Sequence, residues 1–292
     1  MSVEIPVAFV HKWRDDVIHL SQQEGSRLRP LVRSQTGIKG KSDNWERLGA
    51  TAMQKITSRH AKTPLISTPH SRRRCTLGDY NVADVIDSQD AQKVMAKLEG
   101  EYMQAMANAA GRQYDDLIIS AATGNAVSVG SDDTETNVAL PSAQKIAHGS
   151  AGLTLAKIIE AKRILDASDV DERIPRCLAV SAKQMEDMLG INQITSMDYN
   201  NQKTLVNGSV DTFLGFKVIR TERLGTDSNG DRQVLAWAMD GIGLSIGAEA
   251  DMVTRISERA DLNYATQCYL ELCAGATRIE DEKVVEIACQ ES

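Results

Sequence analysis

The chain of 292 residues contains 42% hydrophobic and 25% charged residues and has a formal net charge of -7. This composition is typical of a folded globular protein and excludes an intrinsically disordered chain. The apolar run at residues 5–10 is too short for a signal peptide or a membrane span, so we expect a protein that folds in the cytosol and has no membrane partner.

The charge is unevenly distributed along the chain. Residues 1–75 hold 14 Lys or Arg against 6 Asp or Glu, whereas residues 76–292 hold 19 against 34. The first part also contains four of the six prolines. A basic, irregular segment therefore precedes an acidic and more regular body.

The first predicted element is a short amphipathic helix over residues 7–20. Its apolar side chains recur at helical spacing: Val10, Trp13, Val17 and Leu20. A helix of this length is not stable alone in water. We therefore expect it to need a partner surface and treat these four residues as candidate interface residues.

Residues 36–71 show no sustained periodicity and are punctuated by Gly and Pro. Two weak strand patterns occur near residues 50–57 and 65–68. A loop of this length is unusual inside a compact domain. We therefore interpret the segment as a projecting hairpin that folds against something else.

Three consecutive arginines, Arg72, Arg73 and Arg74, directly follow this segment. Such a cluster could bind nucleic acid, an acidic ligand or another copy of the chain. Single-strand binders interleave basic residues with aromatic ones, but no aromatic residue lies in the cluster, and the pI of the chain is near 5.4. These observations favour contact with acidic groups of the chain itself or of its neighbours, and the alternative is a solvated turn.

The longest periodic pattern follows at residues 87–120. Its apolar stripe has steps of mostly three or four residues, which predicts a helix that spans an elongated subunit. The stripe consists of Ala91, Val94, Leu98, Tyr102, Met106, Ala109, Tyr114, Leu117 and Ile118.

The remaining elements predict an α+β fold. We expect a helix at 153–168 with Leu155, Ile158, Ile159 and Leu165 inward, a buried strand at 176–182 and a short helix at 182–190. Strand regions follow at 210–224 and 233–247, around a turn cluster. The last segment, 261–289, predicts a long strand, a turn near Gly275 and a final strand.

No catalytic, cofactor or metal site can be assigned from these residues. The stretch "GLSIG" around Ser245 matches a nucleophile elbow, but no histidine follows it, so a serine hydrolase remains a distant alternative. The pairs Asp115–Asp116 and Asp132–Asp133 are adjacent in sequence, and we expect both on solvated surface. Five dispersed cysteines without a close pair predict reduced, mostly buried thiols.

The order of these segments resembles the major capsid proteins of tailed bacteriophages, which have the Hong Kong 97-like fold. The resemblance covers nearly the whole chain and depends on the order of its segments, since no single motif is decisive. It is carried by "QQEGSRLRPLVR", by the stretch from "WERLGATAM" to "DVIDSQD", by "QKVMAKLEGEYMQAMANAAGRQYDDLIISAATG", by the run from "TLAKIIEAKRIL" to "VDTFLGFKVIRTERL", and by "YLELCAGATRIEDEKVVEIAC".

The resemblance implies a division of the chain into the parts of that fold. We expect an N-terminal arm at 1–35 and an extended loop at 36–80. The long spine helix and the first part of the peripheral domain are expected at 81–126, the axial domain at 127–247 and the C-terminal strands of the peripheral domain at 248–292.

The resemblance also implies a function and partners. The chain would be the non-enzymatic subunit of an icosahedral head shell, assembled from itself as hexamers and pentamers in the bacterial host cytoplasm. The shell would enclose double-stranded DNA without sequence-specific binding. Separate scaffolding, portal and decoration proteins are possible partners, because the residues before the loop are too few for a scaffolding segment. Encapsulin compartments share the fold and are the alternative.

Overall fold

The protein is described by a computed structural model that covers residues 21–60, 62–63, 65–86, 98–130, 132–191, 211–248 and 251–291. Its helices and strands, in chain order, are η2 (Arg29–Leu31), β1 (Arg33–Ile38), β2 (Ser42–Leu48), β3 (His70–Thr76), β4 (Gly78–Ile86), α2 (Leu98–Thr123), β5 (Ala126–Val129), β6 (Glu135–Val138), η3 (Ser142–Gln144), β7 (Lys145–Ile146), α3 (Leu155–Ala167), β8 (Arg176–Val180), α4 (Ala182–Leu189), β9 (Thr212–Phe213), β10 (Phe216–Arg220), β11 (Arg232–Ala238), β12 (Ile242–Gly247), β13 (Val253–Arg259), η4 (Ala260–Leu262), β14 (Ala265–Arg278), η5 (Asp281–Lys283) and β15 (Val284–Cys289).

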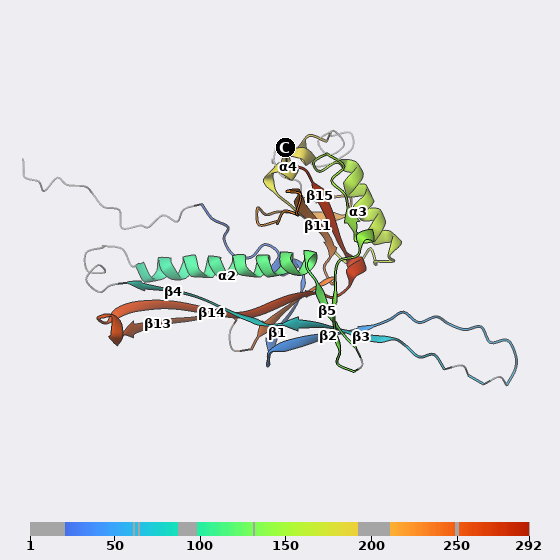
Figure 1. The fold of residues 1–292 in the computed structure, drawn as a ribbon, viewed down its shortest axis with the longest axis horizontal. Coiled ribbons are helices and arrows are strands. Elements are labelled where there is room, and N and C mark those ends of the chain that lie inside the picture. Colours follow the sequence, from blue (N-terminus) through green and yellow to red (C-terminus); the bar gives the residue numbers. More distant parts are fainter. Residues whose placement is uncertain are drawn as a thin grey trace, which may run out of the picture.

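The subunit is elongated along α2, as the long periodic pattern predicts (Figure 1). The helix has 26 described residues and is therefore about 39 Å long. The predicted helix began at residue 87, but positions 87–97 lie outside the described residues. At its other end the helix continues past the expected limit to Thr123.

The body of the subunit is α2 packed on a five-stranded sheet. In this sheet β14 pairs with β12, β13 and β4, and β1 pairs with β12 in parallel. The apolar stripe of the helix meets the inner face of β14. This core includes Met106, Tyr114, Ile118, Leu270 and Leu272.

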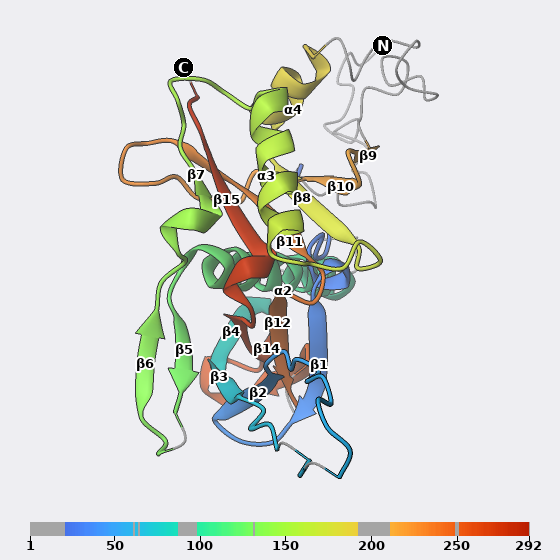
Figure 2. The same ribbon diagram turned by 90° about the vertical axis from the view of Figure 1, so that its right-hand side faces the viewer.

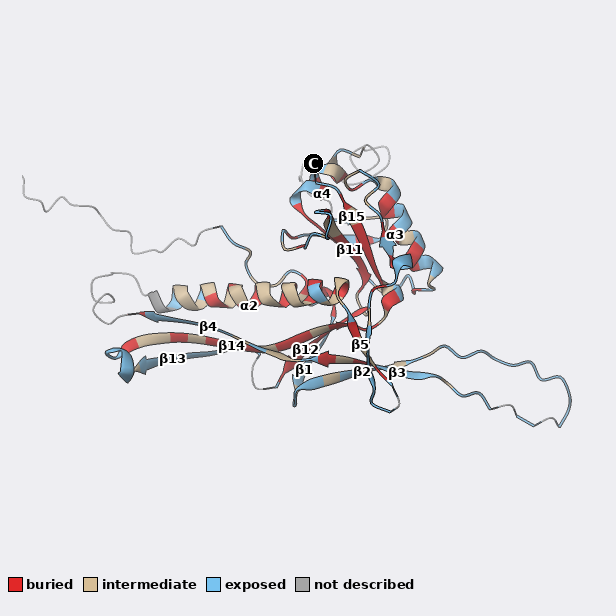
Figure 3. Ribbon diagram, in the orientation of Figure 1, coloured by how far each residue is buried: buried red, intermediate tan, exposed pale blue. Residues whose placement is uncertain are grey.

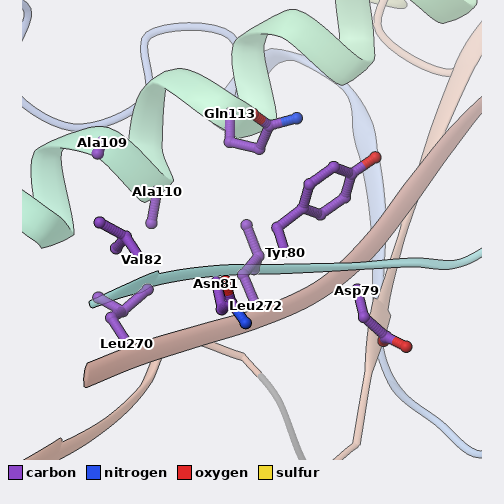
Figure 4. Close-up of a pocket in the computed structure, with 9 residues that line it drawn as sticks. All are labelled: Asp79, Tyr80, Asn81, Val82, Ala109, Ala110, Gln113, Leu270 and Leu272. Atoms are coloured by element: carbon purple, nitrogen blue, oxygen red, sulfur yellow. The ribbon is translucent and has the colours of Figure 1, made fainter.

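The helix covers β14 more completely than the edge strand β4. Small side chains on α2, Ala109 and Ala110, leave a groove above Tyr80 and Val82 of β4 (Figure 4). Both of these β4 side chains remain half-buried. The helix is therefore fixed to the sheet mainly through β14.

A second layered region rises from the C-terminal end of α2 (Figure 1), on the side of the helix opposite to β12 and β14 (Figure 2). It is a six-stranded sheet in the order β7-β15-β11-β8-β10-β9, against which α3 and α4 pack. Strand β8 is buried along its whole length, as expected. Gln184 Oε1 accepts the backbone N–H of Ser181 at 3.2 Å, which caps α4 at the predicted residue.

A four-stranded sheet in the order β2-β3-β5-β6 forms the base of the projecting hairpin. Backbone pairing between β2 and β3 ends at Leu48 and His70, and residues 49–69 project beyond it. The described residues of this projection contain no strand, so the strand patterns near 50–57 and 65–68 were wrong. Among the described residues, no strand pairs with this projection.

Two further expectations are corrected by packing. Ile159 is half exposed, because the buried stripe of α3 consists of Ile158, Ala161, Ile164 and Leu165. The expected turn near Gly275 is absent, since β14 continues to Arg278 and the chain turns at η5. A Cβ at Gly275 would lie 2.3 Å from the Thr76 carbonyl oxygen, so this glycine permits close backbone approach.

Each sheet draws its strands from separate parts of the chain. β12 lies in the sheet under α2, and β5 and β6 join the hairpin strands. β15 belongs to the six-stranded sheet, whereas β14 does not. The strand region at 233–247 is in fact two strands, β11 and β12, in different sheets. The chain thus crosses between the two regions several times.

The last described residues are clamped to the six-stranded sheet by Glu291. Arg232 donates to both carboxylate oxygens, from Nε at 2.9 Å and from Nη2 at 3.0 Å. Gln184 Nε2 adds a hydrogen bond at 3.0 Å, and Ser181 Oγ donates at 3.2 Å. These bonds, with that of Arg232 the strongest, lower the pKa of Glu291 to about 2.

The clamp predicts a pH-dependent stability difference between the wild type and Glu291→Gln. Because the folded pKa lies below the unfolded one, the carboxylate stabilises the fold above about pH 5 and loses this effect as the pH falls towards 2. After allowance for solvent screening, we expect the variant to lose about 1 kcal/mol at pH 7. Urea unfolding at pH 7, 5, 4 and 3 measures the difference.

The matched control for this prediction is Glu282→Gln, which changes an exposed glutamate. We expect it to unfold like the wild type at every pH. A Glu291→Gln deficit that stays constant from pH 7 to pH 3 would contradict the role given to the Glu291 carboxylate.

Candidate assembly interface

The arginine cluster lies on β3, and its side chains alternate between the two faces of the strand. Arg72 and Arg74 share the exposed face, where Arg72 Nε lies 2.6 Å from Glu46 Oε1 and Arg74 contacts Glu135. Arg73 points to the opposite face and is 3% exposed. Alternation along a strand accounts for this split.

Arg73 is part of a buried junction inside its own chain. Its Nη2 lies 2.6 Å from Asp281 Oδ2, and Arg278 Nε lies 2.6 Å from the other oxygen of the same carboxylate. Burial lowers the pKa of Arg73, as do the charges of Arg47 and Arg278, while Asp281 raises it. Arg73 therefore offers no exposed guanidinium to a neighbour in the isolated subunit, and its ion pair lies within its own chain.

Arg278 joins several elements at this junction. Its guanidinium donates to three backbone oxygens: Ala122 at 3.2 Å, Gly124 at 2.7 Å and Val138 at 2.9 Å. Ala122 lies in the last turn of α2 and Gly124 directly follows the helix, where a positive charge is favoured by the helix dipole. The junction thus links α2, β6, β14 and, through Arg73, the base of the hairpin.

Ser245 lies on β12 and attaches the hairpin sheet to the body. The hydroxyl donates to Asp43 Oδ2 at 2.8 Å and accepts from Trp45 Nε1 at 3.1 Å. A Cβ at Gly243 would lie 2.7 Å from the Trp45 ring, so the glycine of the motif makes room for the indole. The hydroxyl is fully buried on a regular strand and does not have the geometry of a nucleophile elbow.

The adjacent carboxylates of α2 are not solvated surface, contrary to expectation. Asp115 is fully buried and Asp116 contacts Arg223 through both oxygens. They face different partners because neighbouring helical residues point about 100° apart. Asp132 and Asp133, in contrast, lie exposed in a turn, as expected.

The projecting loop, residues 49–69, is the most exposed part of the subunit (Figure 3). Its neck is closed by a hydrogen bond from Gly49 N to Pro69 O at 2.8 Å. Beyond the neck the loop exposes large apolar side chains, Met53 at 102%, Ile56 at 83% and Leu65 at 95%. It contains Lys55, Arg59 and Lys62 but no acidic residue.

Sequence reasoning singled out the arginines and missed these apolar loop residues. A signal was present, because four large apolar residues, the fourth being Ile66, lie in a segment without periodicity or acidic residues. The other candidate interface residues, Val10, Trp13, Val17 and Leu20, lie outside the described residues.

The described residues show two further features relevant to function. None of the described helices is both long and apolar enough to span a bilayer, and no group of three metal-ligating side chains occurs among the same residues. None of the five cysteines, all of which lie among the described residues, forms a disulfide, and only Cys273 is not fully buried. Burial raises the pKa of the Cys289 thiol to about 12.

Comparison with known proteins gives one family and a consistent set of structures. Residues 5–291 match the family model described as phage capsid protein. The capsid of Ralstonia phage GP4 has a TM-score of 0.74 at 10% identity, over 100% of this chain and 99% of that chain. The structure of Mycobacterium phage Che8 has a TM-score of 0.70 at 16% identity, over 95% and 96% of the two chains.

The capsid of cyanophage P-SCSP1u has a TM-score of 0.70 at 14% identity, over 98% of this chain and 94% of that chain. No significant match was found among curated proteins. At these identities the solved structures show only the fold of the chain. The family to which the chain belongs is shown by the family model. Since that model spans nearly the whole sequence, the protein belongs to the phage capsid protein family.

Proposed function

We propose that this capsid protein is the building block of a closed icosahedral shell, in which it forms hexamers and pentamers around a double-stranded DNA genome. The observation that carries the proposal is the loop at 49–69. It exposes Met53, Ile56 and Leu65 almost completely in the isolated subunit. Exposed apolar side chains on a projecting segment are stabilised when a second surface covers them.

The proposed covering surface belongs to a neighbouring subunit. The loop carries three Lys or Arg and no acidic residue, while residues 76–292 are strongly acidic. Opposite charges steer such a contact and fix its register, and buried apolar side chains supply most of the affinity. A second copy of the chain has the charge that fits the loop.

The exposed face of β3 is a second proposed contact. Arg72 and Arg74 pair with Glu46 and Glu135, but these pairs are partly solvated. Exposed pairs contribute only about 0.2–1 kcal/mol each, so the guanidinium groups can exchange their own carboxylates for those of a neighbour at little cost. A shell repeats such small contributions in every subunit.

This proposal predicts that the double change Arg72→Glu with Arg74→Glu lowers particle yield. Raising salt from 0.05 to about 0.5 M should weaken wild-type assembly, because the screening length shortens over this range. Light scattering during assembly measures both effects. The control is Arg72→Gln with Arg74→Gln, which should have an intermediate effect, and an assembly rate insensitive to charge reversal and to salt would contradict the proposal.

The N-terminal residues would provide a third contact. We propose that the stripe Val10, Trp13, Val17 and Leu20 docks on a neighbouring subunit, with assembly taking place in the host cytoplasm. Separate scaffolding, portal and decoration proteins would assist. Removing residues 1–20 should leave the circular dichroism of the subunit unchanged and impair particle formation.

Sedimentation of the purified protein, made with the proteins encoded beside it, tests the proposed function. A closed shell predicts a fast, uniform species of many subunits. A sample in which every subunit stays a 31.9 kDa monomer in the presence of those proteins would refute it. No observation favours a serine hydrolase or a compartment shell.

A further inference from the structure

Residues 22–28 lie in a socket on the side of α2. We call this the arm socket and define it by four helix residues, Asn108, Gly111, Arg112 and Asp115. Their spacing of three and four places them on one face of the helix. Arg112 Nη1 donates to Gln22 Oε1 at 2.9 Å and to the Gln23 carbonyl oxygen at 3.1 Å.

Asp115 is the centre of the arm socket. Its carboxylate is fully buried and accepts hydrogen bonds from four uncharged donors of one short segment. The donors are the backbone N–H of Arg27 at 3.1 Å, the backbone N–H of Leu28 at 3.0 Å, the Ser26 hydroxyl and the Gln23 amide. A buried carboxylate without donors is strongly unfavourable, so Asp115 holds the segment in place.

Gly111 allows the backbone of the segment to rest directly on the helix. A Cβ at this position would lie 2.4 Å from the Gly25 carbonyl carbon and 2.6 Å from its Cα. Gly25 itself has φ of +63°, and its N–H donates to Asn108 Oδ1 at 3.3 Å. Glycine in the middle of a helix lowers its stability, and the close approach to Gly25 accounts for this one.

The segment is also fixed on the far side of the socket. Leu28 is fully buried, and the Arg29 guanidinium lies 4.8 Å from the centre of the Tyr114 ring. Arg27 Nη1 donates to the Arg220 carbonyl oxygen at 2.6 Å. The chain is thus held on both sides of Gly25, and its path is determined from Gln22 onwards.

We propose that the arm socket is a positioning device that fixes the direction in which residues 1–21 leave the subunit, and so determines which neighbour the N-terminal arm reaches. Asp115 and Gly111 are its positioning residues. The assembly part of this inference rests on the proposed function, whereas the binding of residues 22–28 is a property of the unassembled subunit and can be measured there.

The first test compares two glycines of the same helix. Gly111→Ala introduces the clash with Gly25, whereas Gly100→Ala adds a methyl group with no atom within 4 Å. Hydrogen exchange of the unassembled subunit is followed in a peptide that covers residues 21–32. We expect Gly111→Ala to speed exchange there at least about tenfold and Gly100→Ala to leave it unchanged. Unchanged exchange in Gly111→Ala would overturn the socket.

The second test compares two aspartates of the same helix. Asp115→Asn keeps the size of the side chain but replaces one acceptor oxygen with a donor facing the backbone amides. Asp116→Asn weakens the contact with Arg223 and leaves residues 22–28 untouched. We expect faster exchange at 21–32 only in Asp115→Asn. Equal exchange in the two variants would overturn the role of Asp115.

Particle geometry separates positioning from a merely structural role. Variants with fast exchange at 21–32 but wild-type circular dichroism should give particles of mixed size or open form. Particles of wild-type size and yield from such variants would overturn the positioning role. If the wild type itself forms no particles, the proposed function fails, but the exchange results still decide whether the arm socket exists.

Discussion

Replacing Met53, Ile56 and Leu65 together by serine is expected to abolish particle formation while leaving the subunit folded. These side chains are almost fully exposed in the subunit, so their loss should change its free energy of unfolding by no more than about 0.5 kcal/mol. In a shell, each would contribute about 1.5–3 kcal/mol when buried against a neighbour. Since every subunit repeats the contact, the losses add up over the whole particle.

Electron microscopy and sedimentation measure particle formation in this variant, and thermal unfolding measures the stability of the subunit. The matched control replaces the same residues by apolar ones, Met53→Leu, Ile56→Val and Leu65→Met, and should assemble. Normal particles from the serine variant would show that the loop is not an interface. A large fall in subunit stability would show instead that the loop packs on its own body.

The second large effect is expected from Arg278→Met, which should destabilise the subunit by about 3–5 kcal/mol. The change removes the partner of one Asp281 oxygen and leaves the carbonyl oxygens of Ala122, Gly124 and Val138 without this donor. Buried acceptors and a buried carboxylate that lose their partners are costly. The junction between α2, β6 and β14 should loosen as a result.

Urea unfolding of the unassembled subunit measures the effect of Arg278→Met. The matched control is Arg72→Met, which removes a partly exposed ion pair with Glu46 and should cost less than about 1 kcal/mol. A loss below about 1 kcal/mol for Arg278→Met would mean that the junction is replaceable by apolar packing, as is known for some buried ion pairs.

Helices with a regular spacing of apolar residues could be predicted from the sequence, because that spacing is a local property of the chain. The pattern at 87–120 gave a long helix, and Met106, Tyr114 and Ile118 are buried against the sheet as expected. The short helix α4 begins after Ser181. In both cases the residues that determine the helix lie close together in the sequence: the apolar stripe in α2, and the capping residue in α4.

Features that depend on contacts between distant residues could not be predicted. The sequence around Asp115 does not distinguish it from a solvent-exposed aspartate. It is buried because residues 23–28 pack against it in the fold. Ser245 matched a catalytic motif, but Gly243 of that motif makes room for the Trp45 ring, and the Ser245 hydroxyl accepts a hydrogen bond from Trp45, which is 200 residues away in the sequence. Gly275 resembled a turn residue, because turns often contain glycine. In the structure a glycine is needed at this position for another reason: the backbone of Thr76 lies so close that a side chain would not fit.

The arginine cluster shows, within three residues, what local sequence predicts and what it does not. Alternation along an extended strand follows from the geometry of the backbone, and it separates Arg72 and Arg74 from Arg73. Alternation does not predict which of the two faces is buried. That depends on Asp281, the ion-pair partner of Arg73, which is distant in the chain. The basic character of the segment was visible in the sequence, but the burial of its central residue was not.

Electron cryomicroscopy of particles of this protein is the most direct test of the account. It predicts a closed shell in which residues 49–69 of each subunit lie against another subunit, with Met53, Ile56 and Leu65 covered. Particles in which the loop folds back on its own subunit, or stays uncovered in solvent, would contradict the central claim that this loop holds neighbouring subunits together.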